Sequence, residues 1–530
     1  MTAYTNPVLP GFYPDPSVCR VGDTYYLANS TFEYFPAIPL HASTDLVTWT
    51  PIGHAIDRAG QVDLTGVPDS GGIFAPTLRH HDGVFYLVCT NMGSSISPGG
   101  GSFLITAADP AGPWSDPVWI ENAAGIDPSL HFHDGKIWWV GCRPVDPGAY
   151  FGEFEVWLRE LDVDAGELVG DEYLLWNGAS RIATWTEGPH LYERNGWFYL
   201  IASEGGTERK HAAAVARSRD LTGPYEGYLG NPILTHRHLG ETFTVQNVGH
   251  TDMVEAVDGS WWLFALGVRT VDGQHLLGRE TFLTPVSWEA DWPVINAGVG
   301  RLSASGSTPF STTSAPTAAE FHQEFRREVI GDTDRAPVGG QWLSLRGSPD
   351  WATTGGGGMR LTPTDDDLSS PTGSPAFLGY RLQHLQVDLS IRVAPPVVGV
   401  IVGLALRQSA GFQLRLELVA VGDGYEVTAV RRDGAVDTVA GSTRFASPPA
   451  TPSLDDFELT ASLHGLEVTL GVSRGADIRT VAVVDALVLS TEYAGGFVGT
   501  VAGPFAVRSP GADGSDTSPA TILSFSYAGR

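Results

Sequence analysis

The chain has 530 residues, with 32 basic and 60 acidic side chains and a formal net charge of −28. This excess of negative charge repels phosphate backbones, so we expect no nucleic-acid partner. The longest apolar run, residues 397–406, is too short to cross a bilayer, and we expect no membrane partner. The 64 Gly and 36 Pro favour many turns and few long helices.

The N-terminal segment has no basic residue before Arg20 and no apolar stretch typical of a secretory signal. The three cysteines, Cys19, Cys89 and Cys142, are too far apart for a metal site and too few for a disulfide framework. We interpret them as buried, reduced thiols. Together these features predict a cytoplasmic protein.

A tight turn followed by an aromatic strand recurs five times along the first 300 residues or so. The turn is usually Asp-Gly or Asn-Gly, which supplies the positive φ of a β-hairpin, and a short extended segment precedes each turn. Alternation with a period of two excludes repeated helix pairs. Five sheets of about four strands predict a five-bladed β-propeller over residues 1–302. The repeats are at 21–30, 81–90, 133–142, 194–203 and 257–266.

Residues 303–320 are rich in Ser, Thr, Ala and Pro and are predicted to be a linker. Beyond them, residues 321–530 contain long strands of alternating polarity. In FQLRLEL (412–418), Phe and Leu occupy one face, while Gln, Arg and Glu occupy the other. Half-buried antiparallel strands of this kind predict a jelly-roll-like β-sandwich, which we expect to pack on the propeller mouth. A carbohydrate-binding module is a second interpretation of this region.

In a propeller, the first strand of each blade lines the central channel, and equivalent residues at its start surround one mouth. Those positions carry Asp15, Asp127 and Glu187 in the first, third and fourth blades. Each alone could be a turn-capping residue. Three converging acids, however, cost free energy through repulsion and desolvation, so stability explains them poorly. Paired carboxyl groups are the usual machinery of glycoside hydrolysis.

The runs NPVLPGFYPDPS, GGIFAPTLRHHDGVFYL, GIDPSLHFHDGK, TEGPHLYERNGWFYL and LGRETFLTPVSWEADWPV resemble the family-43 glycoside hydrolases, in particular the two-domain β-xylosidases and α-L-arabinofuranosidases. This resemblance implies that Asp15 is the general base, Glu187 the general acid, and Asp127 a carboxylate that orients the acid and raises its pKa. The family inverts configuration, which implies roughly 6.5–9.5 Å between the carboxyl groups of Asp15 and Glu187.

The resemblance also points to His250 and Arg279. His250 matches an axial histidine of the propeller channel, which lies near either a water cluster or a cation such as calcium. Arg279 matches an arginine that contacts the sugar, where it would also lower the pKa of Asp15. The alternative for Arg279 is an ordinary ion pair with Glu280.

Three phenylalanines complete the expected substrate-binding set. Phe32 and Phe74 match aromatic walls of the sugar site, although many β-xylosidases have Trp at the second position, which weakens any preference for xylose over arabinose. Core packing is the alternative for both. Phe497 is expected to reach from the sandwich into the propeller mouth, with nearby Phe505 as the other candidate.

The sequence thus predicts an exo-acting, inverting glycosidase that releases xylose from short xylo-oligosaccharides. Two alternatives remain. The protein could be an α-L-arabinofuranosidase or an enzyme with both specificities, or it could be a non-catalytic sugar-binding propeller. The expected partner is an oligosaccharide substrate. We expect no required cofactor, although the propeller channel could hold a calcium ion. The resemblance is also compatible with a homo-oligomer.

Overall fold

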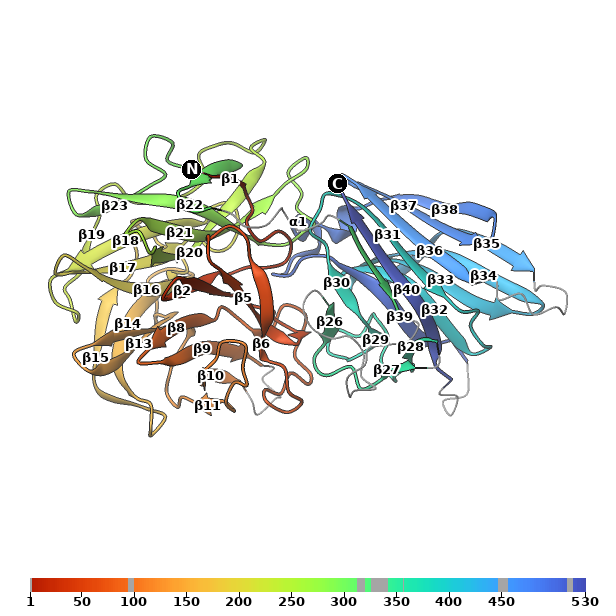
Figure 1. Cartoon of the computed structure of the whole chain (residues 1–530), viewed down its shortest axis with the longest axis horizontal. Helices are drawn as coiled ribbons and strands as arrows, with labels where there is room; N and C mark the ends of the chain where they lie inside the picture. Colours follow the sequence, from red (N-terminus) through yellow and green to blue (C-terminus); the bar gives the residue numbers. More distant parts are fainter. Residues whose placement is uncertain are drawn as a thin grey trace.

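Nearly every regular element of the structure, a computed structural model, is a β-strand (Figure 1). The structure describes residues 2–93, 100–311, 320–325, 342–355, 357–446, 456–511 and 518–530. Two lobes lie side by side, the N-terminal lobe in red to green and the C-terminal lobe mostly in teal to dark blue (Figure 1). The described helices are a 3-10 turn, Leu487–Leu489, and α1, Thr491–Ala494. Neither is long and apolar enough to cross a membrane.

The N-terminal lobe contains five antiparallel sheets, each forming one blade. The blades follow one another in sequence, so the predicted five-bladed propeller is confirmed. Blade one is β2 (Ser17–Val21), β3 (Thr24–Ala28), β5 (Ala37–Ser43) and β6 (Thr50–Ile56). Blade two is β7 (Gly72–Ile73), β8 (Thr77–His81), β9 (Val84–Met92), β10 (Gly101–Ala107) and β11 (Val118–Trp119). Blade three is β12 (Ile126–His133), β13 (Lys136–Pro144), β14 (Phe154–Asp162) and β15 (Glu167–Trp176). Blade four is β16 (Glu187–Arg194), β17 (Trp197–Glu204), β18 (Ala212–Ser218) and β19 (Glu226–Gly227). Blade five is β20 (Val245–Glu255), β21 (Trp261–Arg269), β22 (Glu280–Glu289) and β23 (Trp292–Ile295).

The hairpin turns have the backbone that their sequences predict. Asn195 and Gly196, between β16 and β17, have φ values of 53° and 69°. Two successive positive φ values match the right-handed twist of the strands that they join. Arg194 therefore pairs directly with Trp197, and the register of the blade is set at its turn.

The C-terminal lobe is a sandwich of two large antiparallel sheets with an apolar core between them. One sheet has the order β27-β28-β40-β31-β36-β37-β38, and β25 also pairs with β40. The other has the order β35-β34-β33-β32-β39-β30-β26-β4, and β29 also pairs with β39. The predicted β-sandwich is confirmed. Its first strands are β25 (Glu320–Glu324), β26 (Trp342–Leu345), β27 (Ala352–Gly355), β28 (Gly358–Leu361), β29 (Ala376–Phe377), β30 (Gly379–Arg381), β31 (Gln386–Val393) and β32 (Val400–Ser409). The later strands are β33 (Phe412–Val421), β34 (Gly424–Asp433), β35 (Val436–Ala446), β36 (Phe457–His464), β37 (Glu467–Arg474), β38 (Asp477–Asp485), β39 (Val501–Arg508) and β40 (Ala520–Gly529).

The outer face of β33 differs from the half-exposed strand that its alternation predicts. Leu414 and Leu416 point into the core, but Gln413 and Arg415 are also buried. The Gln413 amide donates to the carbonyl oxygens of Leu368 and Ala410, because a loop covers this part of the sheet. Polar residues on the second face of a strand therefore meet protein here rather than solvent.

The two lobes share a sheet. Strand β4 (Tyr34–Phe35), which lies within the propeller sequence, pairs with β26 of the sandwich. In the predicted 303–320 linker, β24 (Ser305–Thr308) pairs with β1 (Thr2–Thr5) at the start of the chain, and residues 312–319 lie outside the described residues. The domain limits at 302 and 321 stay predictions.

Candidate active site

The three predicted acids stand at the start of first strands and line one pocket. Asp127 is the second residue of β12, Glu187 is the first of β16, and Asp15 lies two residues before β2. The pocket measures about 360 Å³ including its open mouth, and its lining contains every residue that the sequence singled out. The lining residues are Asp15, Phe32, Phe74, Ala75, Ile126, Asp127, Glu187, Thr207, His250, Arg279 and Phe497.

Irregular backbone aims two of these acids into the pocket. The register of β12 shifts between Ile126 and Ser129, and that of β16 shifts after Glu187. Such bulges bend a strand and redirect its side chains. Asp15 and Asp127 also have positive φ values of 51° and 50°, which a non-glycine residue adopts at a cost and which cluster at functional sites.

Asp15 is buried and held by charged and polar partners. The Arg279 guanidinium donates to its Oδ1 at 2.7 Å, and the Ser30 hydroxyl donates to Oδ2. His250 Nδ1 lies 3.8 Å from Oδ1. Burial raises the pKa of Asp15, but Arg279, His250 and the Ser30 hydrogen bond outweigh it, and the pKa lies below its ordinary value. Asp15 is therefore ionised at neutral pH.

Glu187 has the opposite electrostatic environment. Burial, followed by the negative charges of Asp127 and Asp15, raises the pKa of Glu187 well above its ordinary value, and Arg279 opposes this only in part. Glu187 therefore keeps its proton to a higher pH than an ordinary glutamate does. A half-buried carboxyl group with a raised pKa and a buried one with a lowered pKa thus face the same pocket, which is the pairing that general acid–base chemistry requires.

The third acid, Asp127, also has a raised pKa. Burial and the charge of Asp15 raise the pKa of Asp127 to about 6, against the lowering effects of His250 and of the Gly188 backbone N–H. The hydrogen bond to Gly188 attaches Asp127 to the residue that follows Glu187. Asp127 can therefore both position the strand that carries Glu187 and disfavour its ionisation.

The aromatic wall comes from both lobes. Phe497 stacks on Phe32 with ring centroids 5.7 Å apart, and Phe74 meets both rings edge-on at 5.4 and 6.1 Å. Phe497 is 38% exposed, so its ring is available at the mouth. Phe505, the other candidate, lies buried in β39, so Phe497 is the residue that reaches the pocket.

Arg279 joins the charged and aromatic parts of the site. Its guanidinium lies 5.3 Å from the ring centroid of Phe32 and donates to the Thr207 hydroxyl at 3.2 Å. The alternative ion pair with Glu280 is not formed, because Glu280 accepts from Arg269 at 2.8 Å. Thr207 is a lining residue that the sequence analysis missed, since it lies in a loop between β17 and β18 that has no repeated motif.

The surroundings of His250 do not fit a calcium ion. The His250 backbone N–H donates to Ser203, and its ring faces Asp15. Calcium takes six to eight oxygen ligands. Among the described carboxylates near His250, Asp15 and Asp252 are already paired with Arg279 and Arg79, and Asp127 alone is left as a further donor, far fewer oxygens than calcium requires. We therefore assign the chemistry of this pocket to protein groups and water.

A buried charge cluster supports the aromatic wall, and no sequence motif indicated it. Asp69 accepts from Arg346 and Arg407 of the sandwich, each at 2.7 Å, and Glu33 Oε1 lies 3.8 Å from Arg407. Glu33 also accepts from the Ser70 N–H, and the Ser70 hydroxyl accepts from the backbone of Phe497. The cluster therefore connects the two lobes immediately behind the pocket.

Comparisons with known proteins agree with this architecture. The sequence profile "Glycosyl hydrolases family 43" matches residues 4–293, and the profile "Beta xylosidase C-terminal Concanavalin A-like domain" matches residues 333–528. The chain is 37% identical over 515 residues to a xylosidase/arabinosidase of Butyrivibrio fibrisolvens, covering 96% of each chain. It is 36% identical over 540 residues to a non-reducing end alpha-L-arabinofuranosidase of Bacteroides ovatus, covering 99% of this chain and 94% of that one. A xylan beta-1,4-xylosidase structure from Bacillus halodurans superposes with a TM-score of 0.86 at 29% identity, covering 99% of this chain and 100% of that one. With its fold and both of its lobes matched, the chain belongs to glycosyl hydrolase family 43.

Proposed function

We propose that this glycoside hydrolase releases single xylose units from the non-reducing ends of short xylo-oligosaccharides, with inversion at the anomeric carbon. One observation carries the proposal: within one small pocket the pKa of Asp15 is lowered and that of Glu187 is raised. An inverting hydrolase needs these two protonation states at the same pH.

The reaction follows from these states. Glu187 donates its proton to the glycosidic oxygen as the bond from that oxygen to the anomeric carbon breaks. Asp15 accepts a proton from a water molecule whose oxygen forms the new bond on the opposite face. The products are a sugar of inverted configuration and a shortened oligosaccharide. Glu187 then takes up a proton from solvent, and Asp15 releases one to solvent. Asp127 keeps Glu187 protonated and positioned.

The walls of the pocket support hydrolysis at the end of the sugar chain rather than within it. Phe32, Phe74 and Phe497 contact one another, and Phe497 comes from the second lobe. Aromatic faces are suited to the apolar face of a sugar ring. Arg279, which already holds Asp15, has further donors that can bind sugar hydroxyl groups. A pocket of this size and shape suits one terminal sugar residue.

An α-L-arabinofuranosidase, or an enzyme with both activities, is the second candidate. The relative from Bacteroides ovatus carries that name, and the one from Butyrivibrio fibrisolvens is named for both sugars. Phe74 in the sugar wall is smaller than tryptophan, which favours tolerance of more than one pentose ring.

Parallel assays on aryl β-xyloside and aryl α-L-arabinofuranoside test the proposal, with NMR identifying the anomer formed first. We expect faster release from the xyloside and an inverted first product. Glu187→Gln should lower kcat on xylobiose by roughly 10²- to 10⁴-fold, the usual contribution of a positioned acid. Glu160→Gln, at an exposed ion pair with Lys136, is the matched control. A retained anomer, or turnover by Glu187→Gln equal to that of the control, would refute the mechanism.

A cytoplasmic location and a homo-oligomer stay predictions. Fractionation of the producing cells tests the first, and light scattering on the purified protein tests the second.

A further inference from the structure

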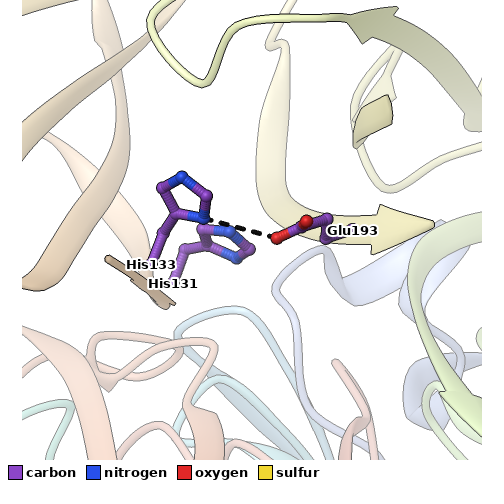
Figure 2. Close-up of side chains that lie close together, drawn as sticks. All are labelled: His131, His133 and Glu193. Atoms are coloured by element: carbon purple, nitrogen blue, oxygen red, sulfur yellow. Dashed lines mark ion pairs between the residues drawn. The ribbon is translucent and has the colours of Figure 1, made fainter. Parts of the chain in front are cut away.

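A second group of potential ligands lies at the other end of two strands that carry active-site acids. β12 contains Asp127 near its start and ends at His133, and β16 begins at Glu187 and ends at Arg194. Near these far ends, His131 and His133 of β12 face Glu193 of β16 (Figure 2). Four residues of extended strand separate Asp127 from His131, roughly 13 Å. This group is therefore distinct from the catalytic pocket.

The topology explains why these three side chains meet. His131 and His133 are two residues apart on a strand, so their side chains point to the same face. β12 and β16 are the first strands of neighbouring blades and pack beside each other. One potential ligand atom from each residue lies within 4.8 Å of the others. In the described part of the chain, this is the one group of three such residues that meets that distance.

The His131 ring has a buried nitrogen with no partner. The residue is 8% exposed, and its Nε2 makes no hydrogen bond. Its ring also forms a hydrogen bond with the backbone of Leu191, which must use the other nitrogen, Nδ1. A neutral imidazole fixed by a hydrogen bond at one nitrogen presents a free lone pair at the other.

His133 has a similar arrangement, with Glu193 on one side and Asp134 on the other. Its Nδ1 lies 3.3 Å from the Glu193 carboxylate, and its Nε2 lies 3.4 Å from that of Asp134. In a tetrahedral zinc site with bonds of about 2.0–2.1 Å, neighbouring ligand atoms are about 3.4 Å apart. The spacing between His133 and Glu193 already matches that value. Asp134 is placed as the outer carboxylate that commonly supports a metal-bound histidine.

The group is rigid on one side and accessible on the other. Phe198 packs edge-on against His131 and His133, with centroids 6.0 and 4.9 Å away. The side chains of His133 and Glu193 are 26% and 49% exposed, so an ion can enter from solvent. Arg79 is the cation that acts on His131, and its charge is offset by its ion pair with Asp252 at 2.8 Å.

From these observations we propose that His131, His133 and Glu193 bind a divalent late transition-metal ion, zinc in particular, which links the third and fourth blades. Two imidazole nitrogens and one carboxylate favour zinc, cobalt or nickel over calcium or magnesium. Water completes the coordination. The ion binds only when the two blades are folded together, so it stabilises the propeller without touching the substrate.

Metal titration of the full chain tests this site. After removal of metals by a chelator, we expect the protein to bind one Zn²⁺ per chain, with a rise in Tm, and no rise with equimolar Mg²⁺ or Ca²⁺. Bound Co²⁺ should give the visible absorption bands of a cobalt ion held by nitrogen and oxygen ligands. Uptake of less than about a fifth of an ion per chain at tenfold excess zinc would overturn the proposal.

Variants at the accessible ligands assign the bound ion, because His131→Ala could disturb the core. We expect His133→Ala or Glu193→Gln to weaken zinc binding more than tenfold, and Asp134→Asn to weaken it about tenfold, in the range seen for outer carboxylates. His322→Ala, at an exposed histidine beside Glu324 on the sandwich, is the matched control and should bind normally. Unchanged zinc affinity in the double variant of His133 and Glu193 would place the ion elsewhere and refute this site.

Discussion

Replacing Asp69 with asparagine tests whether the buried charge cluster holds the two lobes together. Asp69 accepts one hydrogen bond from Arg346 and one from Arg407, both with side chains 0% exposed. Asparagine keeps the shape and an acceptor oxygen but removes the charge. Two buried guanidinium groups would then face Glu33 alone, across 3.8 Å from Arg407.

The expected loss of stability can be worked out from these contacts. Removing one partner of a buried ion pair costs about 3–5 kcal/mol. Burial and the neighbouring charge of Asp69 raise the pKa of Glu33 to about 7, so removal of Asp69 lets Glu33 ionise more readily and offsets part of that cost. We therefore expect the free energy of unfolding to fall by about 3 kcal/mol, the lower end of that range. With an unfolding entropy of about 2.1 cal/mol/K per residue, a chain of 530 residues changes its Tm by about 1 °C per kcal/mol, so Tm should fall by about 3 °C.

Thermal unfolding at pH 7, followed by circular dichroism, measures this effect, and Glu33→Gln is the matched control. Glu33 already carries a proton in a large share of molecules at that pH, so its replacement should lower Tm by less than half as much. We also expect a higher KM in Asp69→Asn, since the neighbouring Ser70 holds the backbone of Phe497. A Tm change below 2 °C, or equal losses in both variants, would show that the cluster does not act as described.

Three further predictions concern the pocket. Asp127→Asn removes a charge that raises the pKa of Glu187, so the alkaline limb of the kcat/KM–pH profile should move to lower pH; an unmoved limb would contradict this. Arg279→Met removes the main charge that lowers the pKa of Asp15, so the acid limb should move to higher pH, and a shift to lower pH would reverse the assignment. Phe497→Ala should raise KM about 2- to 10-fold in steady-state assays while Tm stays nearly unchanged, as one aromatic contact is worth about 0.5–1.5 kcal/mol; an unchanged KM would remove Phe497 from the sugar site.

The repeated turn and aromatic strand were sufficient to predict the propeller. Their period is local, and each repeat carries its own hairpin signal, so Asp15, Asp127 and Glu187 could be placed at equivalent positions of different blades. The structure brings these three acids into one pocket. Phe497 was also predicted to reach that pocket, although the prediction rested on resemblance rather than on any local pattern.

Other features depend on residues far apart in the chain. Alternation in β33 predicted the buried leucines correctly but was wrong about Gln413, because polarity alone does not reveal what covers the second face of a strand. The partners of Asp69 come from the other lobe, and Glu193 meets His133 only because neighbouring blades place β12 beside β16.

The sequence by itself determined the five-fold repeat of hairpins, the starts of the strands and the kind of side chain at the start of each blade. These features follow from local backbone preferences and from polarity. Tertiary structure alone decided the protonation states. Desolvation raises the pKa of both Asp15 and Glu187. Arg279 lies against Asp15 and outweighs this effect, whereas the charge of Asp127 adds to it at Glu187, so the two pKa values move in opposite directions. Electrostatic energy depends on distance in space, and in this fold the ion pair between Asp15 and Arg279 joins residues 264 positions apart.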